Sequence, residues 1–186
     1  MYSRHRVQPN GRVAMLLQDN APTYPSPAGE GRRLEVMLVE DDPLQRLLLA
    51  ECVRRAGLAE RLRVFPDAES ALAVLQGSPV SSEDRPDLIL LDRCLPGLSG
   101  EDLLRSIRAD ERTCTLPVIV LSNSVEPREV LRAYAAGANC YIEKRGTIEA
   151  TTAIMRQIGV FFGSVLTLPP RSAMAPTVDQ VANSGR

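Results

Sequence analysis

Four apolar runs in the sequence each end at residues that can bind or transfer a phosphoryl group. These residues are Glu40, Asp41 and Asp42 after residues 34–39, Asp92 after 88–91, Ser122 after 118–121, and Lys144 shortly after 140–142. A carboxylate can attack phosphorus or bind a hard metal ion, and hydroxyl and ammonium groups can bind phosphoryl oxygens. Together these residue types predict a magnesium-dependent aspartyl-phosphate site.

Lys144 is the only lysine in the chain, and the rest of the 22 basic residues are arginines. Lysine carries a compact point charge on a flexible stem, whereas the guanidinium of arginine is a broad planar group. A single lysine at a strand end therefore indicates a functional choice, and we expect Lys144 to pair with a phosphoryl oxygen.

Length and composition favour one globular domain with tails over two domains. The chain has 186 residues, is 44% hydrophobic and 24% charged, and carries a formal net charge of −1, so nothing indicates a nucleic-acid partner. The four cysteines form no CxxC pair and His5 is the only histidine, which disfavours disulfide frameworks and histidine metal sites. No apolar run is long enough for a signal peptide or a membrane span, and we expect a cytoplasmic protein.

Proline and glycine separate the chain into a core and two tails. Residues 1–33 and 169–186 are rich in residues that disfavour regular structure, so we expect both segments to be flexible. The remaining residues, 34–168, are predicted to form the folded domain, with an extended last helix.

Within that domain, short apolar runs alternate with segments of helical periodicity. The expected strands are 34–40, 62–65, 88–91, 118–121 and 140–142, and the expected helices begin at 43, after Asp67, and at 100, 127 and 148. Five strand–helix repeats predict an α/β fold, a doubly wound parallel sheet with helices on both faces. In such sheets ligands bind beyond the carboxyl ends of the strands, which places the phosphoryl-handling residues at one edge.

The chemistry expected at this edge needs a metal ion. Three neighbouring carboxylates repel one another, and Mg²⁺, which prefers hard oxygen ligands, removes that repulsion. Asp92 would be both a ligand and the nucleophile, while Lys144 and Ser122 would bind phosphoryl oxygens.

The segment 34–168 resembles the receiver domain of two-component response regulators. This is a signalling domain of the chemotaxis type. The motifs that carry the resemblance are Glu40-Asp41-Asp42-Pro43, Asp92-Arg93-Cys94-Leu95-Pro96-Gly97-Leu98-Ser99-Gly100, Leu121-Ser122-Asn123, and the run from Ala135 to Lys144. The resemblance implies a flavodoxin-like sheet with strand order 2-1-3-4-5.

The resemblance also implies a role for each matching residue. Asp92 is expected to accept phosphate from a sensor histidine kinase. Asp41, Asp42 and Asp92, with the backbone carbonyl of Cys94, are expected to bind Mg²⁺. Ser122 and Lys144 would sense the phosphoryl group, and Tyr141 would be the aromatic switch residue that turns inward.

A narrower resemblance links the chain to the small stand-alone receivers that are paired with bacterial phytochromes. It rests on the run Ala133–Tyr141, the apolar tail Ile158–Phe162 and the closing Leu168-Pro169-Pro170. It implies a phosphorelay protein without an output domain that forms a homodimer through its last helix and extension, and whose output is protein contact. Such a protein has no nucleic-acid or membrane partner.

Some positions depart from the family, and other interpretations stay open. Arg145 stands where the family usually has proline, and Arg93 is an unusually charged neighbour for the phosphoacceptor. Asp42 could be only a helix cap, Ser122 a turn serine and Tyr141 a core aromatic. The alternative functions are a non-phosphorylated scaffold and a haloacid-dehalogenase-type phosphatase. The phosphatase family needs an acid at the position of Cys94, so we expect a self-phosphorylating receiver rather than a turnover enzyme.

Overall fold

Strands and helices alternate along the chain in the computed structural model, which describes residues 34–77, 85–144 and 146–168. The strands are β1 (Leu34–Val39), β2 (Ala59–Phe65), β3 (Leu88–Asp92), β4 (Val118–Ser122) and β5 (Cys140–Glu143). They form one sheet of order β2-β1-β3-β4-β5, and every neighbouring pair is parallel. The predicted fold class and strand order are therefore confirmed.

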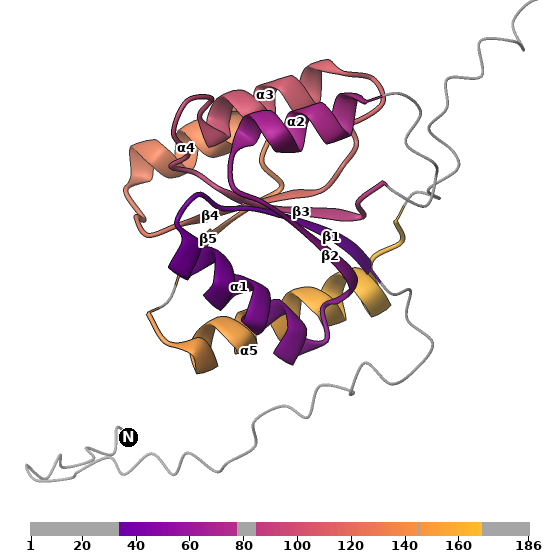
Figure 1. Ribbon diagram of the computed structural model, residues 1–186, viewed down its shortest axis with the longest axis vertical. Helices are drawn as coiled ribbons and strands as arrows, with labels where there is room; N and C mark the ends of the chain where they lie inside the picture. Colours follow the sequence, from indigo (N-terminus) through magenta and orange to yellow (C-terminus); the bar gives the residue numbers. More distant parts are fainter. Residues whose placement is uncertain (1–33, 78–84, 145, 169–186) are drawn as a thin grey trace, which may run out of the picture.

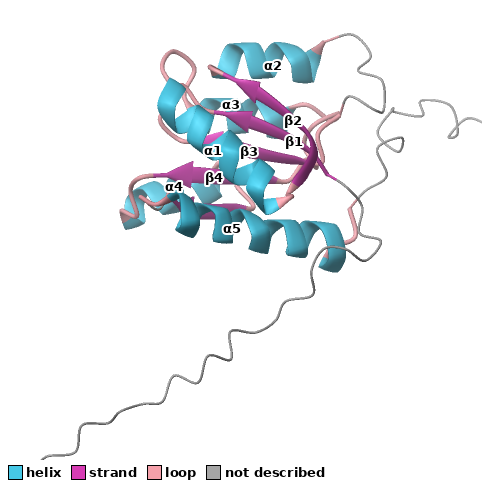
Figure 2. Ribbon diagram, turned by 60° about the horizontal axis from the view of Figure 1, so that its bottom comes forward, coloured by secondary structure: helices cyan, strands magenta, loops and turns pink. Residues whose placement is uncertain are grey.

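The helices cover both faces of the sheet, as Figures 1 and 2 show. One face is covered by α1 (Pro43–Ala56) and α5 (Ile148–Val160). The other is covered by α2 (Ala68–Gln76), α3 (Gly100–Ala109) and α4 (Pro127–Ala135). This arrangement leaves the carboxyl-terminal ends of the strands uncovered by helices, where a ligand can approach.

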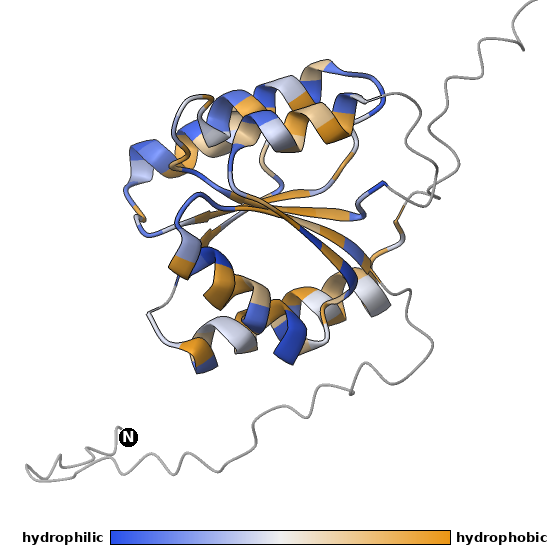
Figure 3. Ribbon diagram, in the orientation of Figure 1, coloured by the Kyte–Doolittle hydropathy of each residue, from blue (hydrophilic) through white to orange (hydrophobic). Residues whose placement is uncertain are grey.

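Alternating side chains in the central strands build two separate cores. In β1, Met37 and Val39 pack toward α2, α3 and α4, whereas Val36 and Leu38 pack toward α1 and α5. Because both faces of β1, β3 and β4 are buried, these strands are mostly apolar, and Figure 3 shows them largely in orange; their polar residues are Glu35, Asp92 and Ser122. The continuous apolar runs of the sequence are thus the signature of doubly covered parallel strands.

Four strands differ from their predicted bounds by one residue, two elements differ by more, and the predicted tails lie outside the described residues. Strand β2 begins at Ala59 rather than at residue 62, because it pairs with β1 along nearly its whole length. Helix α5 ends at Val160 and continues as a π-helical turn, η1 (Phe161–Val165). Among the described residues, no helix is both long enough and apolar enough to cross a membrane.

The guanidinium of Arg108 joins α3 to the two loops that flank β4 and β5. It donates hydrogen bonds to the carbonyl oxygens of Cys114, Leu116 and Gly137 and to Oδ1 of Asn139, at 2.8–3.0 Å. Replacing Arg108 with alanine should lower the free energy of unfolding by about 2–3 kcal/mol, because several partly buried acceptors lose their donor. Urea unfolding followed by circular dichroism measures this change.

A matched control for this prediction lies one turn earlier on the same helix. Arg105 is also an arginine of α3, but its side chain is 57% exposed, and its ion pairs with the described residues are to Glu101 and Asp102 of the same helix. Replacing Arg105 with alanine should cost no more than about 0.5 kcal/mol. Equal losses for the two variants would show that the Arg108 contacts do not stabilise the loops.

Candidate functional site

Three carboxylates meet where β1 and β3 end. Glu40 and Asp41 follow β1 directly, and Asp92 is the last residue of β3. Because β1 and β3 are paired in register, with Val39 opposite Leu91, their ends lie side by side. Each of the three residues offers a carboxylate oxygen, and these oxygens all lie within 4.8 Å of one another. This spacing would be strongly repulsive without a nearby cation.

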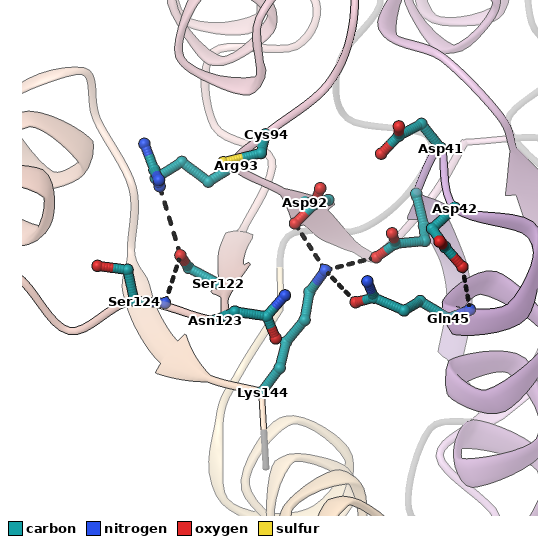
Figure 4. Close-up of a pocket in the computed structure, with 11 residues that line it drawn as sticks. Asp41, Asp42, Gln45, Asp92, Arg93, Cys94, Ser122, Asn123, Ser124 and Lys144 are labelled. Carbon is teal, nitrogen blue, oxygen red and sulfur yellow. Dashed lines mark hydrogen bonds and ion pairs between the residues drawn. The ribbon is translucent and has the colours of Figure 1, made fainter. Parts of the chain in front are cut away.

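Lys144 supplies a positive charge to this cluster, as Figure 4 shows. Its Nζ lies 2.7 Å from Oδ1 of Asp92 and 2.6 Å from Oε2 of Glu40, and it donates a third bond, 3.1 Å long, to Gln45. The backbone N–H of Lys144 donates to the carbonyl of Ser122, which fixes the residue beside the end of β4. The ammonium thus lies where it can bind an oxygen of any group attached to Asp92.

The environment of the cluster shifts two pKa values. Burial alone would lower the pKa of Lys144, but its hydrogen bonds to Asp92 and Glu40 outweigh this and raise it. Burial raises the pKa of Glu40, and the neighbouring charge of Asp92 raises it further, against the opposing effect of Lys144. The pKa values of Lys144 and Glu40 can both be raised because the single ammonium of Lys144 is shared between two carboxylates. The site therefore has more negative charge than Lys144 alone compensates.

Glu40 fits a metal ligand better than the sequence analysis anticipated. Its side chain is 1% exposed, and its Oε1 is buried without a hydrogen-bond partner among the described residues. A buried carboxylate oxygen without a donor is costly, and a divalent cation would satisfy it. Glu40, Asp41 and Asp92 are thus a donor set of the hard-oxygen type that Mg²⁺ and Mn²⁺ accept.

Asp42, which was predicted to bind the metal directly, has a different local role. Its Oδ1 accepts hydrogen bonds from the backbone N–H groups of Leu44 and Gln45, both 2.8 Å long, and so caps α1. A pocket lies at the ends of these strands, and Asp42 is one of its lining residues. However, Asp42 does not belong to the group of closely spaced carboxylates found among the described residues. The group of closely spaced carboxylates thus contains Glu40 and not Asp42, and the predicted metal-binding role of Asp42 stays a prediction.

Ser122 ends β4, next to Asp92 across the sheet. Its side chain is buried, and its Oγ accepts hydrogen bonds from Nε of Arg93 at 3.3 Å and from the backbone N–H of Ser124 at 3.2 Å. The same pocket is lined by Asp92, Ser122 and Lys144 and has a volume of about 280 Å³. Asp41, Asp42 and Cys94 line it as well, so all the predicted site residues except Tyr141 are brought together around one cavity.

The loop after Asp92 is held close to the strand end by Gly100, the first residue of α3. A Cβ atom at Gly100 would lie 2.3 Å from the carbonyl oxygen of Asp92, so only glycine allows this approach. Cys94, in the same loop, lines the pocket, and its side chain is exposed. The metal-binding role expected of its backbone carbonyl stays a prediction. Arg145, the departure noted after Lys144, lies outside the described residues.

Tyr141 lies in β5, near the loop that follows β4. Its hydroxyl donates a 2.7 Å hydrogen bond to the carbonyl of Ser124, and its half-buried ring packs against the core under α3 and α4. The residue therefore contacts the segment that contains Ser122, and its role as a switch stays a prediction.

Two polar contacts of this site, made by Gln45 and Arg93, could not be predicted from the sequence. Gln45 accepts from Lys144, yet it is an ordinary polar residue in the first turn of a helix, so no sequence signal marks it. Arg93 was noted for its charge, but its contact with Ser122 depends on how β3 and β4 are placed in space.

Comparisons with known proteins agree with this geometry. The family model described as the response regulator receiver domain matches residues 36–156. Response regulator Rcp1 of Synechocystis sp. is 30% identical over 135 residues, which cover 72% of this chain and 92% of Rcp1. The similarity is thus spread over the whole sheet and the helices around it.

Two solved structures also resemble this chain. The phosphorylated cyanobacterial phytochrome response regulator RcpA is 32% identical with a TM-score of 0.67, covering 74% of this chain and 99% of RcpA. The Mn²⁺-bound form of Rcp1 is 29% identical with a TM-score of 0.63, covering 73% of this chain and 99% of Rcp1. The RcpA structure is thus of a phosphorylated protein, and the Rcp1 structure is of a protein with a bound divalent metal.

Proposed function

The chain belongs to the response regulator receiver family of two-component signalling proteins, and we propose that Asp92 is its phosphoacceptor. The observation that carries this proposal is the position of Asp92 within reach of Lys144, Glu40 and Asp41 at once. A nucleophile, a cation and metal-binding carboxylates are the parts that phosphoryl transfer to a carboxylate needs.

The proposed reaction moves a phosphoryl group from a phosphohistidine of a sensor kinase to Asp92. A carboxylate oxygen of Asp92 forms a bond to phosphorus, the P–N bond of the donor breaks, and the released imidazole nitrogen takes a proton. Lys144 already holds Oδ1 of Asp92 at 2.7 Å, so its ammonium can bind a phosphoryl oxygen as negative charge is brought in. Ser122, whose hydroxyl borders the same cavity, would donate to another phosphoryl oxygen.

We assign Mg²⁺ as the metal, with Glu40, Asp41 and Asp92 as its carboxylate ligands. The orphaned Oε1 of Glu40 and the short spacing of the three carboxylates support this assignment. When bound, the ion would neutralise charge on the phosphoryl oxygens. The backbone carbonyl of Cys94 is proposed as a further ligand, and Asp42, which caps α1, is proposed to contribute its charge rather than a direct bond to the metal.

Intact-mass spectrometry after incubation with a small acyl phosphate tests this function. The wild-type chain should gain one phosphoryl group only when Mg²⁺ is present, and the matched variant Asp92→Asn should gain none. Asparagine keeps the shape of the side chain but is a poor nucleophile. If the folded wild-type protein shows no mass gain, the phosphorylation proposal fails and the scaffold alternative replaces it.

The upstream partner is proposed to be a sensor histidine kinase of the phytochrome class. Support comes from the similarity to RcpA, a cyanobacterial phytochrome response regulator, 99% of which is covered by this chain. A cytoplasmic location follows from an ATP-dependent kinase as donor, and the net charge of −1 gives no reason to expect a nucleic-acid target. Transfer of radiolabelled phosphate from a purified phytochrome kinase would support this partner, and transfer only from unrelated kinases would exclude it.

A homodimer through the end of α5 and its extension is also proposed. Phe161, Val165 and Leu166 expose between 40% and 68% of their surface there. Monomeric proteins rarely expose large apolar side chains so close together. Sedimentation of the wild-type chain beside Val165→Asp tests this surface. A weak specific dimer would have a dissociation constant of roughly 100 μM. If the wild-type chain is still a monomer above that concentration, the proposed dimer is ruled out.

A further inference from the structure

The side chain of Arg93 connects the candidate site to helix α4. Its Nε donates to Oγ of Ser122 at 3.3 Å, and one of its terminal nitrogens lies 3.0 Å from Oε1 of Glu129 in the first turn of α4. The two charged side chains are only 17% and 15% exposed. We call this chain of contacts from Ser122 through Arg93 to Glu129 the Arg93 bridge. Water screens it less than it screens a surface ion pair.

Glu129 depends on Arg93 for compensation of its charge. Its second oxygen, Oε2, is buried and has no hydrogen-bond partner among the described residues. If the guanidinium moved away, the carboxylate would be left with little compensation in a mostly buried position, which is unfavourable. Loss of the Arg93 contact therefore favours movement of Glu129, and with it the first turn of α4, toward solvent.

Helix α4 is held weakly enough for such a movement. Its N-cap residue, Glu126, makes no side-chain capping bond, and Ala133 is the only buried residue of this fully described helix. Its exposed face carries Leu131 and Tyr134, which are 69% and 49% exposed. Few apolar contacts would be lost if the first turn shifted, and a shift would change the surface that α4 presents.

A phosphoryl group on Asp92 would compete for the atoms that form the Arg93 bridge. The Oγ of Ser122 accepts from two donors, Arg93 and the backbone N–H of Ser124, which leaves its own O–H to donate to a phosphoryl oxygen. Arg93 lines the same pocket as Asp92 and Lys144, and a phosphoryl dianion attracts a guanidinium more strongly than a carboxylate does.

We propose that the Arg93 bridge is a positioning device that stabilises the phosphoryl-free form and is broken on phosphorylation. A phosphoryl group on Asp92 recruits Ser122 and Arg93, Glu129 loses its partner, and the first turn of α4 is released. This inference rests on the proposed function, because it assigns a transmitting role to residues around the same phosphoacceptor.

Binding of beryllofluoride in the presence of Mg²⁺, as a non-covalent substitute for the phosphoryl group, tests the proposal. Glu129→Gln removes the charge that holds Arg93, so its dissociation constant for beryllofluoride should be lower than that of the wild-type chain by about fivefold. Glu129→Ala is a second variant, and urea unfolding verifies that both are folded.

Glu126→Gln is the matched control, because it removes the same charge from the same end of α4 without touching Arg93. Its dissociation constant should stay within about twofold of wild type. In an Arg93→Gln background, Glu129→Gln should have no larger effect than Glu126→Gln. Equal tightening by the two glutamate variants, or the same tightening without Arg93, would overturn the proposal.

Hydrogen exchange of the amides of α4 gives an independent readout. Beryllofluoride should speed exchange in the first turn of α4 in the wild-type chain, whereas Glu129→Gln should exchange rapidly without it. An unchanged first turn in the beryllofluoride-bound wild type would overturn the release of α4. If the wild type does not bind beryllofluoride at all, the proposed function itself fails, which differs from every outcome that contradicts the bridge alone.

Discussion

Replacing Lys144 with methionine is expected to lower the free energy of unfolding of the metal-free protein by about 3 kcal/mol near neutral pH. The ammonium of Lys144 lies between Asp92 and Glu40, and all three side chains are at most 7% exposed. Methionine fills a similar volume but leaves two neighbouring carboxylates without their cation. Urea unfolding in the presence of a chelator measures the loss.

The same variant should show a characteristic dependence on pH. The pKa of Glu40 is raised by burial, and the variant lacks the ammonium that opposes this rise. The folded variant then keeps a proton on Glu40 at pH values where the unfolded chain has released it, so its stability increases as the pH falls toward 4.5. The deficit relative to wild type should therefore be smaller near about pH 5 than near about pH 7.

Lys144→Arg is the control, because it keeps the charge and changes only its shape. It should retain more stability than the methionine variant, and excess Mg²⁺ should recover part of the methionine variant's loss by binding the folded state. A methionine variant as stable as wild type at neutral pH would show that Lys144 does not compensate the carboxylates.

Replacing Glu40 with glutamine is expected to weaken Mg²⁺ binding at least about tenfold. The variant removes one of three closely spaced carboxylates, including the buried oxygen that has no hydrogen-bond partner. An amide oxygen is a weaker ligand than a carboxylate, and it brings no negative charge to the site. Isothermal titration calorimetry or tyrosine fluorescence during a Mg²⁺ titration measures the affinity.

The variant Asp42→Asn tests whether Asp42 is a ligand of Mg²⁺ or only a negative charge near the site. Asparagine caps helices about as well as aspartate, so α1 should remain intact while the charge of residue 42 is lost. We expect a change in Mg²⁺ affinity of no more than about threefold from this variant. A loss at Asp42→Asn that equals or exceeds the loss at Glu40→Gln would restore Asp42 as the ligand.

The sequence was sufficient for the fold because its pattern follows directly from burial. Strands covered on both faces are mostly apolar, and helix starts such as Asp42-Pro43 come just after a strand ends. These local signals placed Asp92, Ser122 and Lys144 at one edge of the sheet, and the structure brings the three residues around one pocket.

The choice among the three consecutive acids could not be made from the sequence. Glu40, Asp41 and Asp42 are all acidic, and although the Asp42-Pro43 pair indicates a helix start, only the structure shows which carboxylate oxygens lie close to one another. The Arg93 bridge was beyond reach for a related reason, since Arg93 and Glu129 are far apart in sequence and are brought together only by the packing of α4.

The position of the phosphoryl linkage tests the central claim most directly. After reaction with a small acyl phosphate and Mg²⁺, borohydride reduction converts an aspartyl phosphate into homoserine, which peptide mass spectrometry locates. The account predicts homoserine at position 92 alone, and none when Mg²⁺ is withheld. Homoserine at position 41 or 42, or an unlabelled position 92 in a phosphorylated chain, would contradict it.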